Sequence, residues 1–273
     1  MTATGDTLPR SASGRSALEI AVHAAQRAGE IILEGFYQPR DYRFKAPRDP
    51  VTSVDLRSEA AVKEILSREF PGFEIQAEES GLAPGDTGFR WFVDPLDGTR
   101  NFVSGIPHFC AAIALSHGDN VLLAATYDPV RKELFHAEAG KGAYLNGCPI
   151  SVSVKQRLEE SLLGFDMGST DSSSGRALDM IRALWPGMQS IRVMGSAALG
   201  LAYAAAARFD LYFHHHLSPW DVAGGLLLVR EAGGMAVDRS GNQTTPQSSS
   251  VIVSSPPILQ EFLDATSGME WRR

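Results

Sequence analysis

The sequence is poor in cysteine: Cys110 and Cys148 are the only two among 273 residues, and there is no C-x-x-C pair. Such a chain builds neither a disulfide framework nor a cysteine-rich zinc site, and a reducing cytoplasm is its simplest setting. Long apolar runs are also lacking, because the longest stretch of small apolar residues, around 197–207, is too short to span a bilayer. Residues 1–16 contain no apolar segment of the kind found in a secretory signal, and their composition is typical of a mobile tail. We therefore expect a cytoplasmic protein that has no membrane partner.

Positive charge is scarce as well. The chain has 25 lysines and arginines against 32 aspartates and glutamates, which gives a formal net charge of −7. Nucleic-acid binding needs a basic face that neutralises phosphates, so we expect no nucleic-acid partner. The acidic balance does not exclude small phosphate esters, because bound divalent cations reverse the local sign of an acidic pocket. The hydrophobic content of 44% is ordinary for a soluble globular protein of one large or two small domains.

One short stretch, residues 91–102 (WFVDPLDGTRNF), combines a buried-strand pattern with a turn. Three apolar residues run directly into Asp94, as a buried strand does when it delivers a carboxylate at its end. A proline then interrupts the strand, and an Asp-Gly pair signals a turn in which the glycine can adopt a positive φ. The turn carries the carboxylates of Asp94 and Asp97, the Leu96 carbonyl and the Thr99 hydroxyl. Hard oxygen ligands of this kind suit Mg²⁺ better than Zn²⁺.

A lone turn of this type is more often an Asx-turn whose aspartates cap loops and face water. Two further acidic clusters change that interpretation. Glu78 and Glu79 follow a predicted short strand at 73–77, and Trp220-Asp221 begin an apolar, glycine-rich helical pattern far downstream. Neighbouring residues at the end of a strand point to opposite sides, so we expect only one of the two glutamates to face a shared metal. The other is then either a partner of the metal ligands or solvated.

Together these motifs resemble those of the inositol monophosphatase family of Mg²⁺-dependent sugar and cyclitol phosphatases. The family's first signature, D-P-x-D-G-T-x-N-F, is matched at residues 94–102. Its second, W-D-x-A-x-G with a later E-A-G-G, is matched at 220–225 and 231–234, and the upstream E-E-S is matched at 78–80. The resemblance covers roughly residues 17–265, and three ordered motifs at the family's spacing are a specific signal.

The resemblance implies a mixed α/β (α+β) fold, a layered αβαβα sandwich of the inositol monophosphatase and fructose-bisphosphatase type, assembled as a homodimer. It also implies a Mg²⁺-dependent phosphoric monoester hydrolase. One metal ion would be held by Glu78, Asp94 and the Leu96 carbonyl. A second would be held by Asp94, Asp97 and Asp221.

The resemblance assigns catalytic roles to Thr99, Asp55 and Glu78. Thr99, backed by Asp55, would orient a metal-activated water for attack on phosphorus, with Glu78 beside the metal that activates it. The N–H groups of Gly98 and Thr99 would receive phosphate oxygens, and no covalent phospho-enzyme is needed. The remaining substrate-binding residues implied are Ser196, His214 and Asp221.

Some of these residues have a second interpretation. Asp55 precedes a helical pattern at 56–70 and is also a candidate cap for that helix. Ser196 stands between a predicted strand and a small-residue helix, where it either caps the helix or helps its free N–H groups attract an anion. His214 stands where members that favour inositol phosphate carry an acidic residue, and it is either substrate-facing or exposed at the rim. The run 214–216 is three histidines, but neighbouring side chains diverge, so one ion could take at most two of them.

The remaining pattern predicts the organisation of the chain. We expect a helix at 17–37, a loop or short extended segment at 41–55 and an antiparallel meander at 109–145. Element spacing widens near 152–161, which suggests a soft boundary. The chain then divides into a flexible tail, an N-terminal α+β subdomain with the metal motifs and a C-terminal α/β subdomain: 1–16, 17–152 and 153–273. In the last of these, 169–175 is expected to be a flexible polar loop.

The expected function is hydrolysis of a small phosphate monoester, similar to inositol monophosphate, by metal-activated water. Because His214 replaces a carboxylate that pairs with ring hydroxyls, related substrates are alternatives: histidinol phosphate, fructose 1,6-bisphosphate or a nucleotide 3′-phosphate. A different class of function is a non-catalytic binding partner of the transcription machinery, as some bacterial relatives resembling this family are. The intact motif set favours catalysis, because a pure binding module has no need for every ligand.

Overall fold

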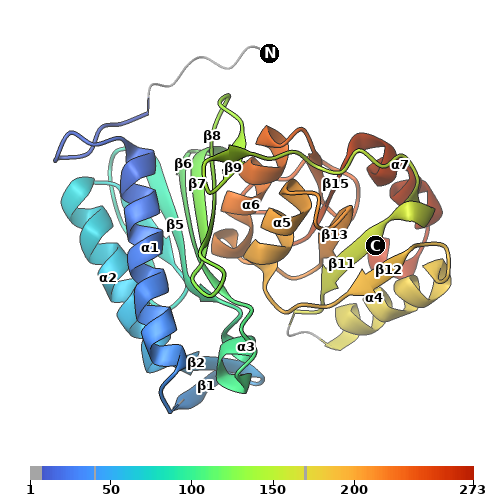
Figure 1. Cartoon of the computed structure of the whole chain (residues 1–273), viewed down its shortest axis with the longest axis horizontal. Helices are drawn as coiled ribbons and strands as arrows, with labels where there is room; N and C mark the ends of the chain where they lie inside the picture. The colour runs from blue at the N-terminus through green and yellow to red at the C-terminus, as the bar shows by residue number, and fades with distance from the viewer. Residues whose placement is uncertain (1–7, 40, 169–170) are drawn as a thin grey trace.

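Two β-sheets and three layers of helices alternate through the molecule (Figure 1). The structure is a computed structural model that describes residues 8–39, 41–168 and 171–273. Of the predicted tail, residues 1–7 lie outside the described part. Residues 8–16 are described and contact the C-terminal end of the second helix, where Ser13 Oγ donates to Glu69 Oε2 at 2.6 Å.

The first layer consists of α1 (Ala17–Phe36) and α2 (Ser53–Glu69), which lie side by side on one face of the larger sheet (Figure 1). Each helix begins with a capping box, in which a side-chain oxygen and a nearby carboxylate satisfy backbone N–H groups reciprocally. Ser16 caps α1 and Thr52 caps α2. Alanine and isoleucine at helical spacing give α1 an apolar face that is fully buried against the sheet. The helix predicted at 17–37 is therefore confirmed.

The larger sheet has eight strands in the order β10-β9-β8-β7-β6-β5-β3-β4. Neighbouring strands are antiparallel except β3 and β5, which are parallel and therefore end at the same edge of the sheet. The meander predicted at 109–145 is confirmed by β6 to β9. The strand bounds are β3 Glu74–Ala77, β4 Gly81–Ala83, β5 Phe89–Asp97, β6 Cys110–His117, β7 Asn120–Asp128, β8 Glu133–Glu138, β9 Ala143–Leu145 and β10 Cys148–Pro149.

The middle layer is α5 (Ala197–Ala205) and α6 (Pro219–Glu231), packed between the larger sheet and a five-stranded sheet. The smaller sheet has the order β12-β11-β13-β15-β14, with β11 parallel to both of its neighbours. Its strands are β11 Leu162–Asp166, β12 Ser190–Arg192, β13 Leu211–His214, β14 Met235–Val237 and β15 Val251–Ser254. The sequence region predicted as a soft boundary, 152–161, connects the two sheets.

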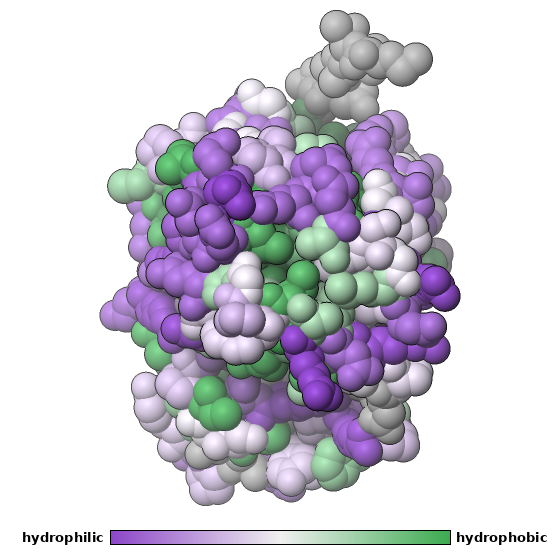
Figure 2. Space-filling view, turned by 90° about the vertical axis from the view of Figure 1, so that its right-hand side faces the viewer, coloured by the Kyte–Doolittle hydropathy of each residue, from purple (hydrophilic) through white to green (hydrophobic). Residues whose placement is uncertain are grey.

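The outer layer is formed by α4 (Asp171–Leu184) and α7 (Pro256–Ala265), with 3₁₀ turns at Leu158–Glu160 and Glu270–Arg272. Seen from that side, apolar side chains gather near the centre of the surface and hydrophilic ones surround them (Figure 2). Three apolar clusters fill the spaces between successive layers. None of the helices in the described ranges combines the length and the apolar character that a membrane span requires.

Three local predictions need correction. The stretch 41–55 is not simply a loop: it contains an antiparallel hairpin of β1 (Tyr42–Ala46) and β2 (Asp49–Thr52) and the first turn of α2. The N-cap of α2 is Thr52 and not Asp55, which sits three residues later. The Thr52 hydroxyl accepts from the free N–H groups of Val54 and Asp55, and Asp55 in turn accepts from the Thr52 N–H. Residues 171–175 of the predicted polar loop form the first turns of α4, and 169–170 lie outside the described residues.

The glycine pair in α6 gives a test of the packing in the middle layer. A Cβ added at Gly225 would lie 2.3 Å from Leu201 Cδ1 in α5, whereas one added at Gly224 would lie 3.5 Å from its nearest neighbour, Ala124 Cβ. We expect Gly225→Ala to lower the free energy of unfolding by about 1–3 kcal/mol through overpacking. Gly224→Ala, the matched control, should be neutral or stabilising by up to about 1 kcal/mol, because alanine favours the helix. Urea unfolding measures both, and equal effects would contradict this account of the motif glycine.

Candidate functional site

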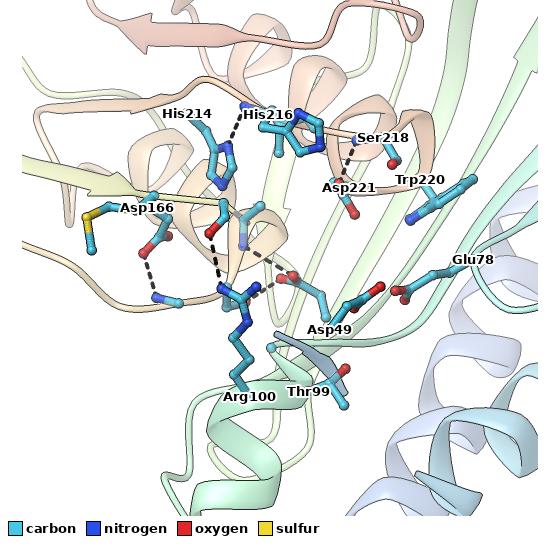
Figure 3. Close-up of a pocket in the computed structure, with 18 of the residues that line it drawn as sticks. Asp49, Glu78, Thr99, Arg100, Asp166, His214, His216, Ser218, Trp220 and Asp221 are labelled. Atoms are coloured by element: carbon cyan, nitrogen blue, oxygen red, sulfur yellow. Dashed lines mark hydrogen bonds between the residues drawn. The ribbon is translucent and has the colours of Figure 1, made fainter. Parts of the chain in front are cut away.

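A cavity of about 510 Å³ opens where the two halves of the chain meet. The β1–β2 hairpin, the end of β5 and the short helix α3 (Thr99–Ser104) form one side of it. The ends of the parallel strands β11 and β13 and the first turns of α5 and α6 form the other side (Figure 3). Carboxyl ends of parallel strands commonly border ligand sites in α/β proteins. Its lining residues include Lys45, Asp49, Glu78, Asp97, Gly98, Thr99, Arg100, Asp166, Ser196, His214, His216, Trp220 and Asp221.

The turn at the end of β5 is fixed by contacts from both sides. The pairing of β5 with β6 is interrupted between Asp94 and Asp97, which lets both carboxylates leave the sheet at the same end. Ser58 Oγ in α2 donates a hydrogen bond to the Pro95 carbonyl at 2.9 Å. Gly98 has φ 93°, and a Cβ there would lie 3.0 Å from the His108 carbonyl. The motif glycine is therefore required both by its backbone conformation and by the close approach of neighbouring backbone.

Asp97 bridges the two halves of the chain. Its Oδ2 accepts hydrogen bonds from the Ser196 hydroxyl and from the Ala198 N–H at 2.9 Å, and its Oδ1 accepts from the Ala197 N–H at 3.2 Å. The N-terminus of α5, predicted to attract an anion, thus holds the protein's own carboxylate. Ser196 is also the N-cap of α5, since its oxygen accepts from the Leu199 N–H at 3.4 Å.

A buried hydrogen-bond chain connects Thr99 to α2. Thr99 Oγ1 lies 3.0 Å from Asp55 Oδ1 and 2.9 Å from the Leu96 carbonyl oxygen, so both are acceptors within its reach. The other oxygen of Asp55 accepts from the Thr52 N–H at 2.9 Å and from the Thr52 hydroxyl at 2.5 Å. Burial raises the pKa of Asp55 above its ordinary value. The structure brings together the Thr99–Asp55 pair that the resemblance implied.

Glu78 and Glu79 do not diverge as predicted. Lys45 Nζ, from β1, donates to Glu78 Oε1 at 2.7 Å and to Glu79 Oε1 at 2.6 Å. The alternation rule fails here because β3 ends at Ala77, and both glutamates lie in the turn beyond it. Burial raises the pKa of Glu78 to about 7, against the opposing effect of Lys45. Glu79 is tied to both Lys45 and the Glu59 carboxylate, through its backbone N–H, and is not merely solvated.

Asp94 and Asp221 complete a group of four acidic side chains with Glu78 and Asp97. Asp94 is 2% exposed and accepts from the Leu96 N–H at 3.1 Å, while Asp221 accepts from the Ser218 N–H at 2.7 Å in the first turn of α6. Burial, followed by the nearby charges of the other three carboxylates, raises the pKa of Asp94 well above its ordinary range. Burial and the charges of Asp97 and Glu78 do the same for Asp221. The four groups are therefore close enough to repel one another in a dry environment.

The chemistry of this donor set fits hard divalent cations. All of the side-chain donors are carboxylate oxygens, the ligands that Mg²⁺ prefers. In the part of the chain that the structure describes, Lys45 is the cationic side chain that pairs with this group, and the N-terminus of α5 donates to Asp97. Within residues 8–39, 41–168 and 171–273, no three histidine, cysteine or acidic side chains are already arranged around one point at ligand distance. Two contacts account for this arrangement: Lys45 engages Glu78, and α5 engages Asp97.

The three consecutive histidines separate as expected. His214 is 5% exposed and lines the cavity, and its Nδ1 accepts from the backbone N–H of His216 at 3.1 Å. Burial lowers the pKa of His214 to about 3, so its imidazole is neutral. His215 turns away from the cavity toward Trp271, with the two rings perpendicular and 6.4 Å apart. His214 thus faces the cavity from within the wall and is not exposed at the rim.

Several cavity residues were missed by the sequence reasoning, among them Lys45, Arg100 and Asp166. Asp166 ends the apolar strand β11, so it carried the same signal that singled out Asp94. Arg100 lies inside the central motif but at one of its two variable positions, where the motif specifies no residue type. Lys45 had no local signal, because its contacts depend on how the β1–β2 hairpin folds over the cavity.

Known proteins share this architecture over nearly the whole chain. Residues 14–269 match the model of the inositol monophosphatase family. Inositol monophosphatase 1 from Solanum lycopersicum is 38% identical, covering 97% of this chain and 99% of that protein. Nus factor SuhB from Pasteurella multocida is also 38% identical, covering 90% of this chain and 94% of that protein.

Solved structures agree with the sequence matches. The extragenic suppressor protein SuhB from Bartonella henselae superposes with a TM-score of 0.88 at 34% identity, covering 92% of this chain and 98% of that one. The Thermotoga maritima inositol monophosphatase gives a TM-score of 0.85 at 30% identity, covering 92% of this chain and 97% of that one. The mixed α/β layered fold predicted from the motifs is confirmed, and the chain belongs to the inositol monophosphatase family.

Proposed function

We propose that this protein is a Mg²⁺-dependent phosphatase that hydrolyses a small phosphate monoester. One observation carries the proposal: four mutually repelling carboxylates, from three separate segments of the chain, converge on one cavity beside the hydrogen-bonded pair of half-buried Thr99 and buried Asp55. Such a group is costly without cations and is the expected donor set for two hard metal ions. Relatives at equal identity include a protein named inositol monophosphatase, which supports the same chemistry.

In the proposed mechanism, Glu78, Asp94, the Leu96 carbonyl, Asp97 and Asp221 hold the metal. When bound, Mg²⁺ supplies charge neutralisation and lowers the pKa of water at the site. The Thr99 hydroxyl donates a hydrogen bond to Asp55 Oδ1. The lone pairs of Thr99 Oγ1 then remain free to accept a hydrogen bond from the attacking water, which orients that water. The N–H groups of Gly98 and Thr99, at the start of α3, receive phosphate oxygens.

The alcohol part of the substrate is the open point of the proposal. A cyclitol phosphate similar to inositol monophosphate is the first candidate, in keeping with the names of several relatives. His214 supplies a neutral imidazole where a carboxylate would pair with ring hydroxyls, which keeps histidinol phosphate, fructose 1,6-bisphosphate and nucleotide 3′-phosphates as alternatives. The homodimer expected from the family stays a prediction.

A second candidate function rests on the other relatives. Several proteins named Nus factor SuhB match this chain at 37–38% identity, as closely as the inositol monophosphatases do. We therefore also consider a binding role with the transcription machinery. Such a role would use the outer surface and would not require the carboxylates of the cavity.

Asp94→Asn and Asp221→Asn test the metal site. Each removes one negative donor while preserving volume, and we expect Mg²⁺-dependent phosphate release from inositol 1-phosphate to fall more than about a hundredfold, since residues that only support ligands already cost 10–100-fold. Asp119→Asn, in the exposed turn between β6 and β7, is the matched control and should retain activity. Circular dichroism confirms folding. Near-normal activity in either cavity variant would defeat the assignment.

The raised pKa values predict how the metal-free protein responds to pH. Folding raises the pKa of Glu78 from 4.5 to about 7 and that of Asp166 from 3.8 to about 6, in both cases chiefly through burial. The folded state then binds more protons than the unfolded state between about pH 4 and pH 7, so these groups lower the free energy of unfolding as pH rises through that window. We expect a lower Tm at pH 8 than at pH 6 without metal. Adding Mg²⁺ at pH 8 should raise Tm in the native protein but much less in Asp94→Asn.

Affinity capture separates the two functions. The tagged full-length protein and its Asp94→Asn variant are used to capture RNA polymerase subunits from a bacterial lysate, with mass spectrometry as the readout. A binding role predicts equal recovery with both forms, because it does not use the cavity. Recovery with neither form would remove the transcription candidate and leave the phosphatase.

A further inference from the structure

Arg100 places a positive charge in the cavity, and within the described ranges its side-chain hydrogen bonds go to backbone carbonyls. It is the second residue of α3, and its side chain extends into the cavity away from Thr99 (Figure 3). Its Nε donates to the Arg48 carbonyl at 3.0 Å and its Nη1 to the Gly168 carbonyl at 3.1 Å. Both acceptors are neutral, and among the residues that the structure describes no carboxylate forms an ion pair with this guanidinium. A guanidinium has five N–H donors in a planar fork, so donors remain for a ligand.

The nearby acidic residue on this wall is already engaged. Asp166 and His214 are register partners on the adjacent strands β11 and β13. Asp166 Oδ1 accepts from the N–H groups of Met194 at 2.9 Å and Gly195 at 2.6 Å, and its Oδ2 accepts from the Tyr212 hydroxyl at 2.9 Å. The Asp166 carboxylate therefore supports the loop before α5, and it neither neutralises Arg100 nor stands free to accept from substrate hydroxyls.

His214 adds a neutral side chain to the same wall. Its ring is buried and neutral, and Arg100 is close enough to contribute to the lowering of its pKa. Asp49 also lines the cavity, but it comes from β2 and is drawn on the side of Glu78 in Figure 3. The cavity is thus divided. The four carboxylates that suit cations stand at one end, and at the other end the Arg100 guanidinium and the neutral His214 imidazole stand with Asp166, whose carboxylate already accepts three hydrogen bonds.

We propose that Arg100 is a specificity-determining residue that binds a second anionic group, a phosphate or a carboxylate, on the alcohol part of the ester. The inference rests on the proposed phosphatase function and narrows it. A neutral polyol offers a guanidinium only hydroxyl acceptors, whereas a phosphate or carboxylate forms stronger, charge-assisted hydrogen bonds that match its planar fork in pairs. A cavity of about 510 Å³ has room for a phosphate at the acidic end and a second anion at the other.

A purely structural role for Arg100 is the competing explanation. Its two carbonyl contacts connect α3 to the β1–β2 hairpin and to the loop after β11, so it could act only as a tie between segments. Loss of such a tie would affect every substrate alike. Loss of an anion contact would affect only substrates that carry the second anion, and mainly through KM.

The experiment uses matched ester pairs with the full-length Mg²⁺-loaded protein. Fructose 1-phosphate and fructose 1,6-bisphosphate differ by a second phosphate, glycerol 2-phosphate and 2-phosphoglycerate differ by a carboxylate, and inositol 1-phosphate is the neutral-polyol reference. We expect kcat/KM to be at least tenfold higher for the second member of one of the two pairs, and that pair identifies the anion. Arg100→Gln should reduce this preference to near one, mainly by raising KM, and Arg100→Lys should retain part of it.

Arg192→Gln is the matched control, because it removes the same charge at a site outside the cavity, where, within the described part of the chain, the Arg192 guanidinium hydrogen-bonds only Ser190 and Ile191. It should keep the preference. Equal rates within both pairs in the native protein, an equal loss in Arg192→Gln, or a uniform loss over all substrates in Arg100→Gln would each overturn the role of Arg100 while the phosphatase function stands. Release of phosphate from none of the five esters would overturn the proposed function and this inference with it.

Discussion

Repulsion among carboxylates that are kept out of water is the constraint on which the site depends. Asp94 and Asp97 leave β5 together, Glu78 comes from the turn after the neighbouring strand β3, and Asp221 comes from α6, far away in the sequence. The raised pKa values of Glu78, Asp94 and Asp221 show that the ionised form of each carboxylate is unfavourable here unless a cation binds it. Unfavourable electrostatic energy of this kind is commonly found at functional sites. The surrounding layers of helices and sheets hold the backbone that positions each carboxylate, so the group stays together in spite of the repulsion.

Two contacts of the metal-free chain partly relieve that repulsion. The Lys45 ammonium lies between Glu78 and Glu79, and the N-terminus of α5 donates to Asp97. In each contact a positive charge or partial charge lies against a carboxylate and stabilises its ionised form, as a bound metal ion would. They explain why the donor set is gathered in one cavity while no three of its members in the described chain already surround a common point.

The sequence was informative wherever a short pattern determines local geometry. The apolar run into Asp94, the turn at Gly98 and the helical spacing of α1 each depend on neighbours within a few residues, and each was predicted. The divergence of Glu78 and Glu79 was predicted wrongly because the rule for strands was applied beyond the end of β3. The assignment of Asp55 as the N-cap was wrong because Thr52 occupies that position. Asp55 is the third residue of α2 and completes the capping box by accepting from the Thr52 N–H.

Features that depend on long-range packing gave no readable signal. Arg100 reaches the Gly168 carbonyl, 68 residues away, and Asp166 holds backbone near Gly195, 29 residues away. Neither contact follows from periodicity or spacing. The resemblance to a family predicted that the acidic motifs converge on one site. It did not predict the wall of the cavity around His214, because this chain departs from the family pattern there.

The contact between Asp97 and α5 has a consequence for how the chain can change over evolutionary time. One carboxylate belongs to the motif of the first half and closes the first turn of a helix in the second half, while Asn101 donates to the Met194 carbonyl across the same junction at 2.7 Å. The junction and the reactive centre are therefore one structure. Neither half can be exchanged with that of a distant homologue, or lost, without leaving unpaired polar groups at the junction and removing the cavity itself.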